Sequence, residues 1–222
     1  ERNLIRYRSR LMRDINRSKN RIKSLLKYQG IEIPAQYAKN NWSQNFLTWI
    51  EQQAAKDELL ADTLLLMLDQ MKLLPQLLVK TEGKLRELRN GKYAVKVKLA
   101  TSVPGIGATT AMQFLLEAGD INRFKGFDAL NDFIGFCPDT DSSGETDRDR
   151  GITTRRHKQL RSALIESAWQ AIRVDPALMN SYQELTKRMK GVHAIIRIAR
   201  KLLRRLRAVL LTGIAYQKGV VA

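Results

Sequence analysis

Apolar residues recur at helical spacing through the first part of the chain. Between residues 2 and 28 they return every three, four or seven positions, at Leu4, Leu11, Ile15, Ile22 and Leu25. The same segment holds ten Lys and Arg residues, and Asp14 is its only acidic residue. This pattern predicts a basic amphipathic helix that Gly30 and Pro34 end, with a loop to about Ser43. Its charged side is equally typical of a solvated helix and of one that contacts nucleic acid.

A second stretch repeats apolar residues in a 4-3 pattern over four heptads, with one miss at Thr81. The repeat consists of Leu60, Leu64, Met67, Met71, Leu74, Leu78, Leu85 and Leu88. It predicts a coiled coil or a long helical hairpin, whose partner is either the first basic helix or another chain. Pro75 lies off the apolar seam and lacks an N–H donor, so we expect it to kink or split this helix. Asn90 and Gly91 are a stop signal, and we predict a domain boundary near residue 91.

Beyond residue 91 no series of strands is evident, and helical periodicity continues in residues 160–172, 177–189 and 192–211. The last segment has an apolar stripe, made of Ile195, Ala199, Leu202, Leu206 and Val209. Its other sides are basic, and we take four residues as candidate phosphate contacts: Arg197, Arg200, Lys201 and Arg204. The fold class expected is all-α. Residues 1–91 would form a basic helix and coiled-coil region, and residues 92–222 a compact helical domain.

Charge narrows the range of partners. The 222 residues include 39 Lys and Arg against 22 Asp and Glu, which gives a net charge of +17 and a pI near 10.2. Such an excess favours a polyanionic partner, with nucleic acid ahead of an acidic membrane. Cys137 is the only cysteine, which excludes an intrachain disulfide and a cysteine-based zinc site, and suits a reducing compartment. Charged residues interrupt every apolar run, so we expect no membrane span and no signal peptide.

A glycine-rich turn lies in residues 99–116, which read LATSVPGIGATTAMQFLL. An apolar helix end, the sequence VPGIG and a second helix from about Ala108 suggest a helix-hairpin-helix element. Backbone N–H groups of the turn and of the following helix could bind one phosphate oxygen without reading bases. The candidate nucleic-acid contacts are Gly105, Ile106, Gly107, Ala108 and Thr109, with Ile106 filling the space between the helices. A helix-capping turn that binds nothing is the alternative.

A serine pair stands in residues 133–161, which read FIGFCPDTDSSGETDRDRGITTRRHKQLR. Ser142 and Ser143 follow Pro138 and precede Gly144. Several cations follow them: Arg148, Arg150, Arg155, Arg156, Lys158 and Arg161. A hydroxyl in a flexible loop beside guanidinium groups suits attack on a phosphodiester, where positioning and charge neutralisation supply most of the catalysis. The alternative is a polar surface loop rich in turn formers.

In this order the motifs resemble the C-terminal part of the IS one-ten family of insertion-sequence transposases, which are serine recombinases guided by a structured bridge RNA. The similarity covers roughly residues 99–217, through SVPGIGATTAMQFLLEAGDINRF, FIGFCPDTDSSG, GITTRRHKQLRSALIESAWQAIRVDP and ARKLLRRLRAVLLTG. It implies that Ser143 is the nucleophile, with Ser142 as the local competitor. The implied chemistry is a covalent phosphoserine link to DNA, followed by strand exchange and resealing.

One stretch departs from the family pattern. The usual ISKxG is replaced by residues 152–156, ITTRR, so a lysine and a glycine are missing from their expected places. It is therefore open which of Arg155, Arg156 or Lys158 approaches the scissile phosphate.

The resemblance also implies parts that this sequence lacks. Family members begin with a RuvC-like domain whose acidic residues bind a divalent metal, with Mg²⁺ expected, so we interpret the chain as a fragment that is inactive alone. The chain itself needs no cofactor; the implied partners are DNA, a guide RNA and further copies of the chain, as a dimer or tetramer through the coiled coil. The expected location is the bacterial cytoplasm, at the nucleoid. Two other hypotheses are a non-catalytic helix-hairpin-helix scaffold and a basic RNA-binding regulator.

Overall fold

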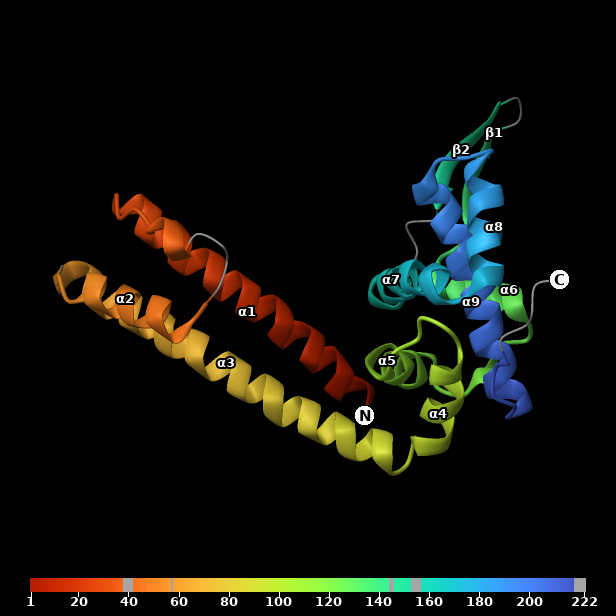
Figure 1. Cartoon of the computed structure of the whole chain (residues 1–222), viewed down its shortest axis with the longest axis horizontal. Coiled ribbons are helices and arrows are strands. Elements are labelled where there is room, and N and C mark those ends of the chain that lie inside the picture. The colour runs from red at the N-terminus through yellow and green to blue at the C-terminus, as the bar shows by residue number, and fades with distance from the viewer. Residues whose placement is uncertain (38–41, 57, 144–145, 153–156, 218–222) are drawn as a thin grey trace. The chain divides into compact units, whose positions relative to one another are not determined.

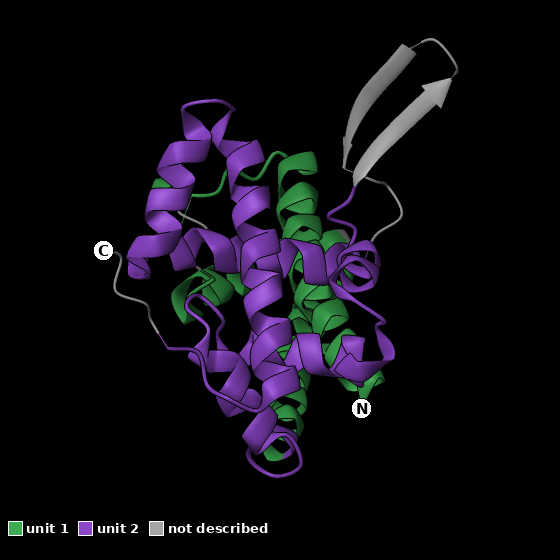
Figure 2. Cartoon of the chain, turned by 90° about the vertical axis from the view of Figure 1, so that its right-hand side faces the viewer, with its two compact units in different colours: residues 1–87 green, residues 88–222 purple. Residues whose placement is uncertain are grey.

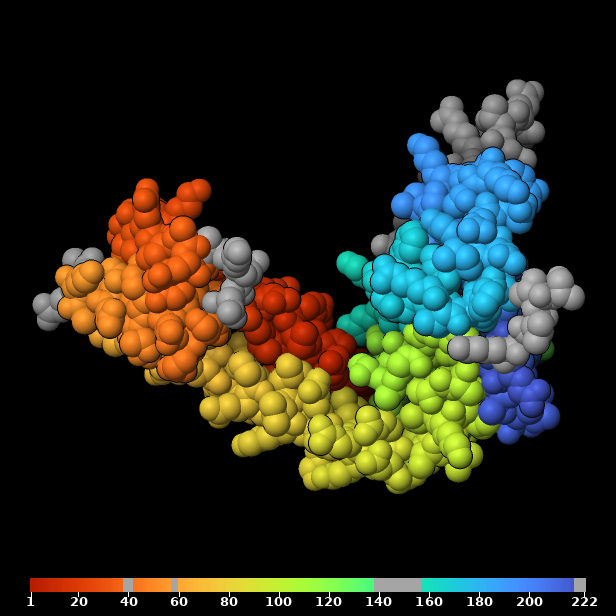
Figure 3. Space-filling view, in the orientation of Figure 1, coloured from red at the N-terminus to blue at the C-terminus, as the bar shows by residue number. Residues whose placement is uncertain are grey.

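The structure is a computed structural model that describes residues 1–37, 42–56, 58–143, 146–152 and 157–217 (Figure 1). Residues 58–59 and 138–152 are described by their backbone alone, and Figure 3 shows the molecule in space-filling form in the same orientation. The chain forms two compact units, residues 1–87 and 88–222 (Figure 2). The division into two functional domains, residues 1–91 and 92–222, stays a prediction from the sequence.

The first unit is a helical hairpin closed by a shorter helix. Helix α1 (Arg2–Tyr28) and helix α3 (Glu58–Asn90) run in opposite directions, with the 3-10 turn η1 (Ala35–Tyr37) and helix α2 (Gln44–Ala54) between them in sequence (Figure 1). The three helices share one core, made of Ile22, Leu26, Phe46, Leu47, Ile50, Ala54, Leu60, Leu64, Leu68 and Met71. An ion pair of 2.8 Å joins Arg8 of α1 to Glu82 of α3. The basic helix predicted over residues 2–28 is confirmed.

Helix α3 continues through Pro75 without being split. Pro75 is exposed, so the missing N–H and the proline ring lie on the solvent side, where water can satisfy the freed carbonyl. The miss in the heptad pattern, Thr81, is buried, and its hydroxyl donates to the carbonyl of Leu77 at 2.7 Å. Part of the apolar seam packs against α1 and α2 of the same chain, so intramolecular pairing accounts for this part of the repeat.

Helix α2 was not predicted. Ser43 is its N-cap, with its hydroxyl accepting from the Phe46 N–H, and Phe46 is 1% exposed. The Phe46 ring stacks on Tyr37 and Trp49, with centroid distances of 5.1 and 5.8 Å. These aromatic contacts, together with the apolar core, stabilise α2 more than its short sequence pattern suggests.

The second unit is built around a central helix. Its elements are α4 (Ala94–Ser102), α5 (Ala108–Ala118), η2 (Ile121–Arg123), α6 (Phe127–Ile134), β1 (Pro138–Ser143), β2 (Thr146–Ile152), α7 (Lys158–Val174), α8 (Pro176–Thr186) and α9 (Gly191–Thr212). Helix α9 contacts α4, α6, α7, α8 and η2. All five residues of its predicted apolar stripe are buried. Nine α-helices make up both cores within the described ranges, which confirms the all-α class.

One local prediction is wrong: the segment around the serine pair is not all loop. Strands β1 and β2 form a two-stranded antiparallel hairpin, called here the serine hairpin (residues 138–152), with an irregularity in register between Pro138 and Thr140. The strands read PDTDSS and TDRDRGI, so no alternation of apolar and polar residues marks them. Without that period-2 pattern, the turn-forming residues gave the stronger signal in the sequence.

Candidate functional site

The turn between α4 and α5 contains two glycines with different roles: the packing requires one of them, and the other faces open space. Gly105 has φ of +80°, and a Cβ there would lie 2.2 Å from the carbonyl oxygen of Ser167 in α7. Only glycine fits, because both the conformation and the close approach exclude a side chain. Ile106 is 4% exposed, and its N–H donates to the Val103 carbonyl at 3.1 Å. Ile106 therefore holds the turn through packing, as the sequence suggested.

Gly107 is the N-cap of α5, and a Cβ there would meet nothing within 4 Å. Its φ of −82° and ψ of 165° are open to any residue, and no side chain caps the helix. The first N–H groups of an α-helix, here those of Ala108 and Thr109, have no partner within the helix. Together with the helix dipole they make a site that suits one phosphate oxygen. Gly107 and Thr109 are exposed, so a ligand can reach them.

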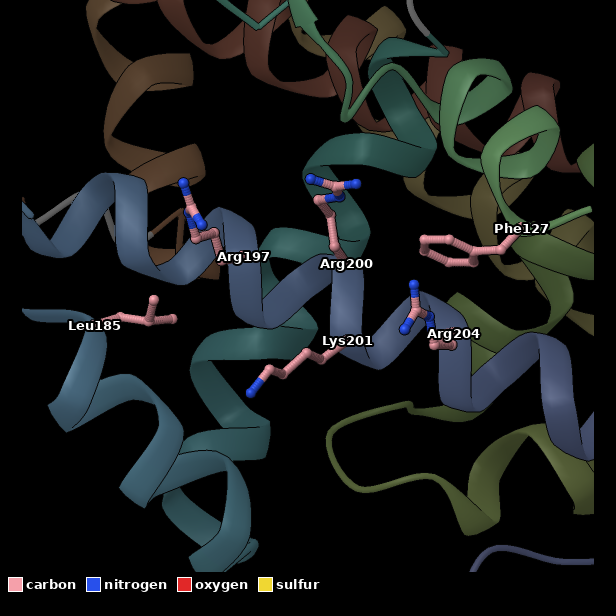
Figure 4. A pocket seen from close by; sticks show the side chains of 6 residues that line it. All are labelled: Phe127, Leu185, Arg197, Arg200, Lys201 and Arg204. Carbon is pink, nitrogen blue, oxygen red and sulfur yellow. The ribbon is translucent and has the colours of Figure 1, made fainter.

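The four predicted cations of α9 line one open pocket of about 230 Å³ (Figure 4). They are Arg197, Arg200, Lys201 and Arg204, joined by Phe127 of α6 and Leu185 of α8. The Arg204 guanidinium lies over the Phe127 ring at 4.6 Å, a cation–π contact that fixes its position. Lys201 Nζ donates to the neutral Ser181 hydroxyl at 2.9 Å. Among the residues that the structure describes, no acid lines the pocket, so its charge is available to a polyanion.

Phe127 was missed by the sequence analysis. A lone aromatic residue at the start of a short helix gives no signal of this kind, because its partner Arg204 lies far along the chain. The stacking arrangement depends on how α6 packs on α9 and is visible only in the fold.

Arg205, another basic residue of α9, has a structural role. Its guanidinium donates to Oδ2 of Asp175 at 2.6 Å, and Asp175 is 3% exposed. Asp175 also caps α8 through the N–H groups of Ala177 and Leu178. Burial acts to raise the pKa of Asp175, but the hydrogen bond and charge of Arg205 and the two backbone donors outweigh it and lower that pKa.

Tyr216 joins this network from the C-terminal segment. Its hydroxyl donates to Asp175 at 3.3 Å, its ring lies 4.7 Å from the Arg205 guanidinium, and its N–H donates to Ser102 Oγ at 2.8 Å. Burial is the main reason that the pKa of Tyr216 is raised. The network ties α4, α8, α9 and the segment after α9 together.

The backbone of the serine hairpin fixes the register of the predicted nucleophile. Ser143 is the last residue of β1 and pairs with Thr146, and Ser142 pairs with Asp147. Arg148 pairs with Asp141, and Arg150 lies further along β2. Arg155 and Arg156 lie outside the described residues.

The two remaining predicted cations stand in the first turn of α7. Lys158 is exposed. Arg161 is half-buried and donates to the carbonyl of Gly135, the C-cap of α6, at 2.8 Å. Arg161 therefore joins α7 to the segment that leads into β1, whereas Lys158 is available to a ligand.

Two negative results apply to the described part of the chain. No cluster of three or more His, Cys, Asp or Glu residues there has an arrangement that could bind a metal ion. None of the helices in this part of the chain combines the length and the apolar character needed to cross a bilayer.

Comparison with known proteins gives one family. Residues 97–183 match the family described as "Transposase IS116/IS110/IS902 family". The matched region runs from α4 to α8 and so includes the glycine turn and the serine hairpin, whereas the α9 pocket cations and the first unit lie outside it.

Two curated relatives carry names of the same kind. One is the "Insertion element IS110 uncharacterized 43.6 kDa protein" of Streptomyces coelicolor, 32% identical over 123 residues, which are 55% of this chain and 30% of the relative. The other is the "Transposase for insertion sequence element IS1111A" of Coxiella burnetii, 39% identical over 67 residues, which are 30% of this chain and 18% of the relative. The matches thus span less than a third of the length of either relative.

Proposed function

We propose, from the premise that residues 97–183 form a transposase domain of the IS116/IS110/IS902 family, that the chain acts in DNA transposition as a serine recombinase. The observation that carries the proposal is this match, since it spans the only part of the chain where a serine pair directly precedes a glycine among basic residues. The open N-terminus of α5 and the basic pocket on α9 support it, because both suit a DNA backbone.

In the proposed reaction the Ser143 hydroxyl attacks the phosphorus of a DNA phosphodiester. A bond forms between the serine oxygen and phosphorus, the bond from phosphorus to one sugar oxygen breaks, and the serine proton ends on the released sugar hydroxyl. Attack by a hydroxyl of another strand reverses these changes and reseals DNA in a new connection. The covalent link conserves the energy of the broken bond, so no nucleotide cofactor is needed.

Cations supply the other part of the proposed chemistry. Charge on the transferred phosphoryl group grows in the transition state, and guanidinium and ammonium groups nearby stabilise it. Lys158 is the predicted cation nearest in sequence to the serine hairpin whose side chain is both described and exposed. The resemblance also implies a divalent metal, but among the described residues no group of three or more His, Cys, Asp or Glu side chains could hold one.

A guide RNA and self-association are further parts of this proposal. The first unit has a basic helix of its own, separate in sequence from the α9 pocket, so two nucleic acids could bind two surfaces of one chain. Helix α3 keeps large apolar residues exposed, Leu66 at 70% and Leu73 at 52%, which favours a dimer or tetramer through this helix. The bacterial cytoplasm, at the nucleoid, is the proposed location.

The test uses this chain joined to the N-terminal domain that the resemblance implies, with guide RNA and labelled target DNA. After denaturation, protein covalently attached to DNA is isolated and the linked peptide is mapped by mass spectrometry. We expect the adduct on Ser143, its loss in Ser143→Ala, and its persistence in the matched control Ser142→Ala. Loss in Ser142→Ala alone would assign the nucleophile to the neighbour. Tight salt-sensitive DNA binding without any adduct would instead support the non-catalytic scaffold.

A further inference from the structure

The N-terminal root of the serine hairpin is held by the end of α6. Phe136 is 2% exposed, and the carbonyl of Gly135 accepts from Arg161. The Cys137 thiol contacts the Asp132 carboxylate and accepts from Asn131 Nδ2 at 2.9 Å. Burial raises the pKa of Cys137 and Asp132 raises it further, so the thiol stays protonated and donates to that carboxylate.

The C-terminal root is His157, the first described residue after β2. Its Nδ1 accepts from the N–H of Leu160 at 3.2 Å and so caps α7. Its Nε2 lies 3.2 Å from Oε2 of Glu117 in α5. Because Nδ1 accepts a hydrogen bond, the ring proton is on Nε2, which donates to the carboxylate. The Phe133 ring of α6 packs against the imidazole at 5.7 Å, so three helices meet at this side chain.

Glu117 stands in an unfavourable position for a carboxylate. It is 2% exposed and is the penultimate residue of α5. At this C-terminal end the helix dipole disfavours negative charge. Burying a carboxylate costs free energy that its hydrogen bonds must offset. The neighbouring residues Leu115, Leu116 and Ala118 are also buried, so an apolar side chain would serve packing alone. His157 Nε2 is a partner of this buried carboxylate, and the contact orients the imidazole.

We propose that Glu117 is a positioning residue: it holds His157 and thereby fixes the serine hairpin on α5. The same helix begins at Gly107, the predicted phosphate contact, and its eleven residues span about 16 Å. One rigid helix thus joins the phosphate contact to the root of the segment that carries the nucleophile. The inference rests on the proposed function, because it concerns the geometry of Ser143 relative to DNA.

The variants separate orientation from charge and from capping. Glu117→Ala removes the acceptor, whereas Glu117→Gln keeps an acceptor oxygen for Nε2 without the charge. His157→Asn keeps a good N-cap for α7 but is too short to reach Glu117. Glu166→Gln, which changes an exposed acid on α7, is the matched control.

The first measurement is hydrogen–deuterium exchange of the whole chain, read by mass spectrometry. In Glu117→Ala and His157→Asn we expect exchange across residues 138–152 to rise about tenfold or more, while Glu117→Gln and Glu166→Gln stay near wild type. Amides in the core of α9 should keep their protection. Exchange that rises equally in α9 would show a general loss of stability. Unchanged exchange in the hairpin would show that the contact between Glu117 and His157 does not anchor it. Either result overturns the inference.

The second measurement is adduct formation on Ser143 in the extended chain used for the proposed function. Adducts should fall at least tenfold in Glu117→Ala and His157→Asn and recover in Glu117→Gln, with DNA affinity unchanged. Adducts that persist while hairpin exchange rises would contradict a positioning role. If wild type forms no adduct, the proposed function fails, and the exchange data still decide whether Glu117 anchors the hairpin.

Discussion

Gly105 and Gly107 stand two residues apart in one turn, but the structure gives them different surroundings. A side chain at Gly105 would meet the backbone of α7, whereas one at Gly107 would enter open space at the N-terminus of α5. We expect Gly105→Ala to lower the free energy of unfolding by about 2–5 kcal/mol, from backbone strain and overpacking. Gly107→Val should cost about 1 kcal/mol or less, because only a weak cap is lost.

Nucleic-acid affinity separates the two glycines further. In Gly107→Val the branched valine side chain would occupy the space that a phosphate needs, so binding should weaken for every sequence tested. Fluorescence anisotropy with two unrelated duplexes at moderate salt measures this, and urea unfolding gives the stability. Unchanged affinity in the folded Gly107→Val variant would exclude a phosphate contact at the turn.

The buried pair of Asp175 and Arg205 predicts a pH dependence of stability. Because the pKa of Asp175 is lowered in the folded state, its contribution is fully present above the ordinary carboxyl range and is lost as pH falls through the folded pKa. Asp175→Asn should lower the free energy of unfolding by about 3 kcal/mol at pH 7, since Arg205 would keep a partly buried charge without its partner.

The difference in the free energy of unfolding between wild type and Asp175→Asn should therefore begin to shrink below about pH 4, where the carboxyl group takes up a proton in the unfolded chain, and should shrink further as pH falls through the lower folded pKa. Thermal unfolding of both proteins from about pH 3 to 7 checks this. A difference that is constant over the whole range would show that the cap and packing, and not the charge pair, account for the cost.

At the scale of elements, helix α1 concentrates the positive charge of the first unit. It carries ten basic residues and one acid, whereas residues 29–87 hold six basic and eight acidic residues. Arg8 faces α3 and pairs with Glu82, but Arg13, Arg17 and Arg21 are exposed at spacings of four along one side. A stripe of this kind matches the regular charge of a nucleic-acid backbone.

Replacing Arg13, Arg17 and Arg21 together by Gln should weaken binding to RNA or DNA and reduce the slope of log affinity against log salt by about 2–3. The matched control is the triple change of Lys80, Lys84 and Arg86 to Gln on α3, all exposed. Filter binding from about 50 to 300 mM salt gives both slopes. Equal losses in the two triples would mean that net charge alone matters and that α1 is a solvated helix.

The same scale shows what the sequence could predict. Long periodic segments such as residues 2–28 and 192–211 are helices, because a 3.6-residue pattern leaves few other ways to bury their apolar side chains. The predicted stripe of 192–211 is buried throughout. In 2–28 the middle of the predicted stripe is buried, whereas Leu4 and Leu25 at its ends are half-buried. Helix α2 was not recognised, since its stability depends on aromatic contacts with η1. The polar strands of the serine hairpin gave no period-2 signal.

The candidate site was predictable only in part for a related reason. The α9 cations could be read from one helix, and the structure places Arg197, Arg200 and Arg204 around one pocket. Arg205 belongs to the same basic run, but it pairs with Asp175, a buried acid thirty residues earlier, and therefore has a structural role. The pair of Glu117 and His157 joins residues forty positions apart and has no local pattern at all.

For the whole molecule, the open question is what covers the exposed apolar side of α3. Leu66 and Leu73 are exposed and stand seven residues apart, which is the repeat of a coiled-coil seam, while the opposite side of the helix already packs within the chain. A second copy of the chain would bury these residues against their equivalents. The double variant Leu66→Lys and Leu73→Lys should then be a monomer with unchanged helix content, since two lysines at a seam repel their copies and are poorly buried.

Sedimentation velocity at micromolar concentration measures the masses, with Val95→Lys on α4 as a control that changes another exposed apolar residue. The wild type and the control should sediment as a dimer or tetramer. A monomeric wild type, or a double variant of unchanged mass, would show that α3 is not the assembly surface. Assembly through α3 would also bring several copies of the basic surfaces into one particle, and a nucleic acid could then bind more than one copy at once. The double variant should therefore bind nucleic acid more weakly than wild type, because avidity is lost with self-association although no contact to the nucleic acid has changed.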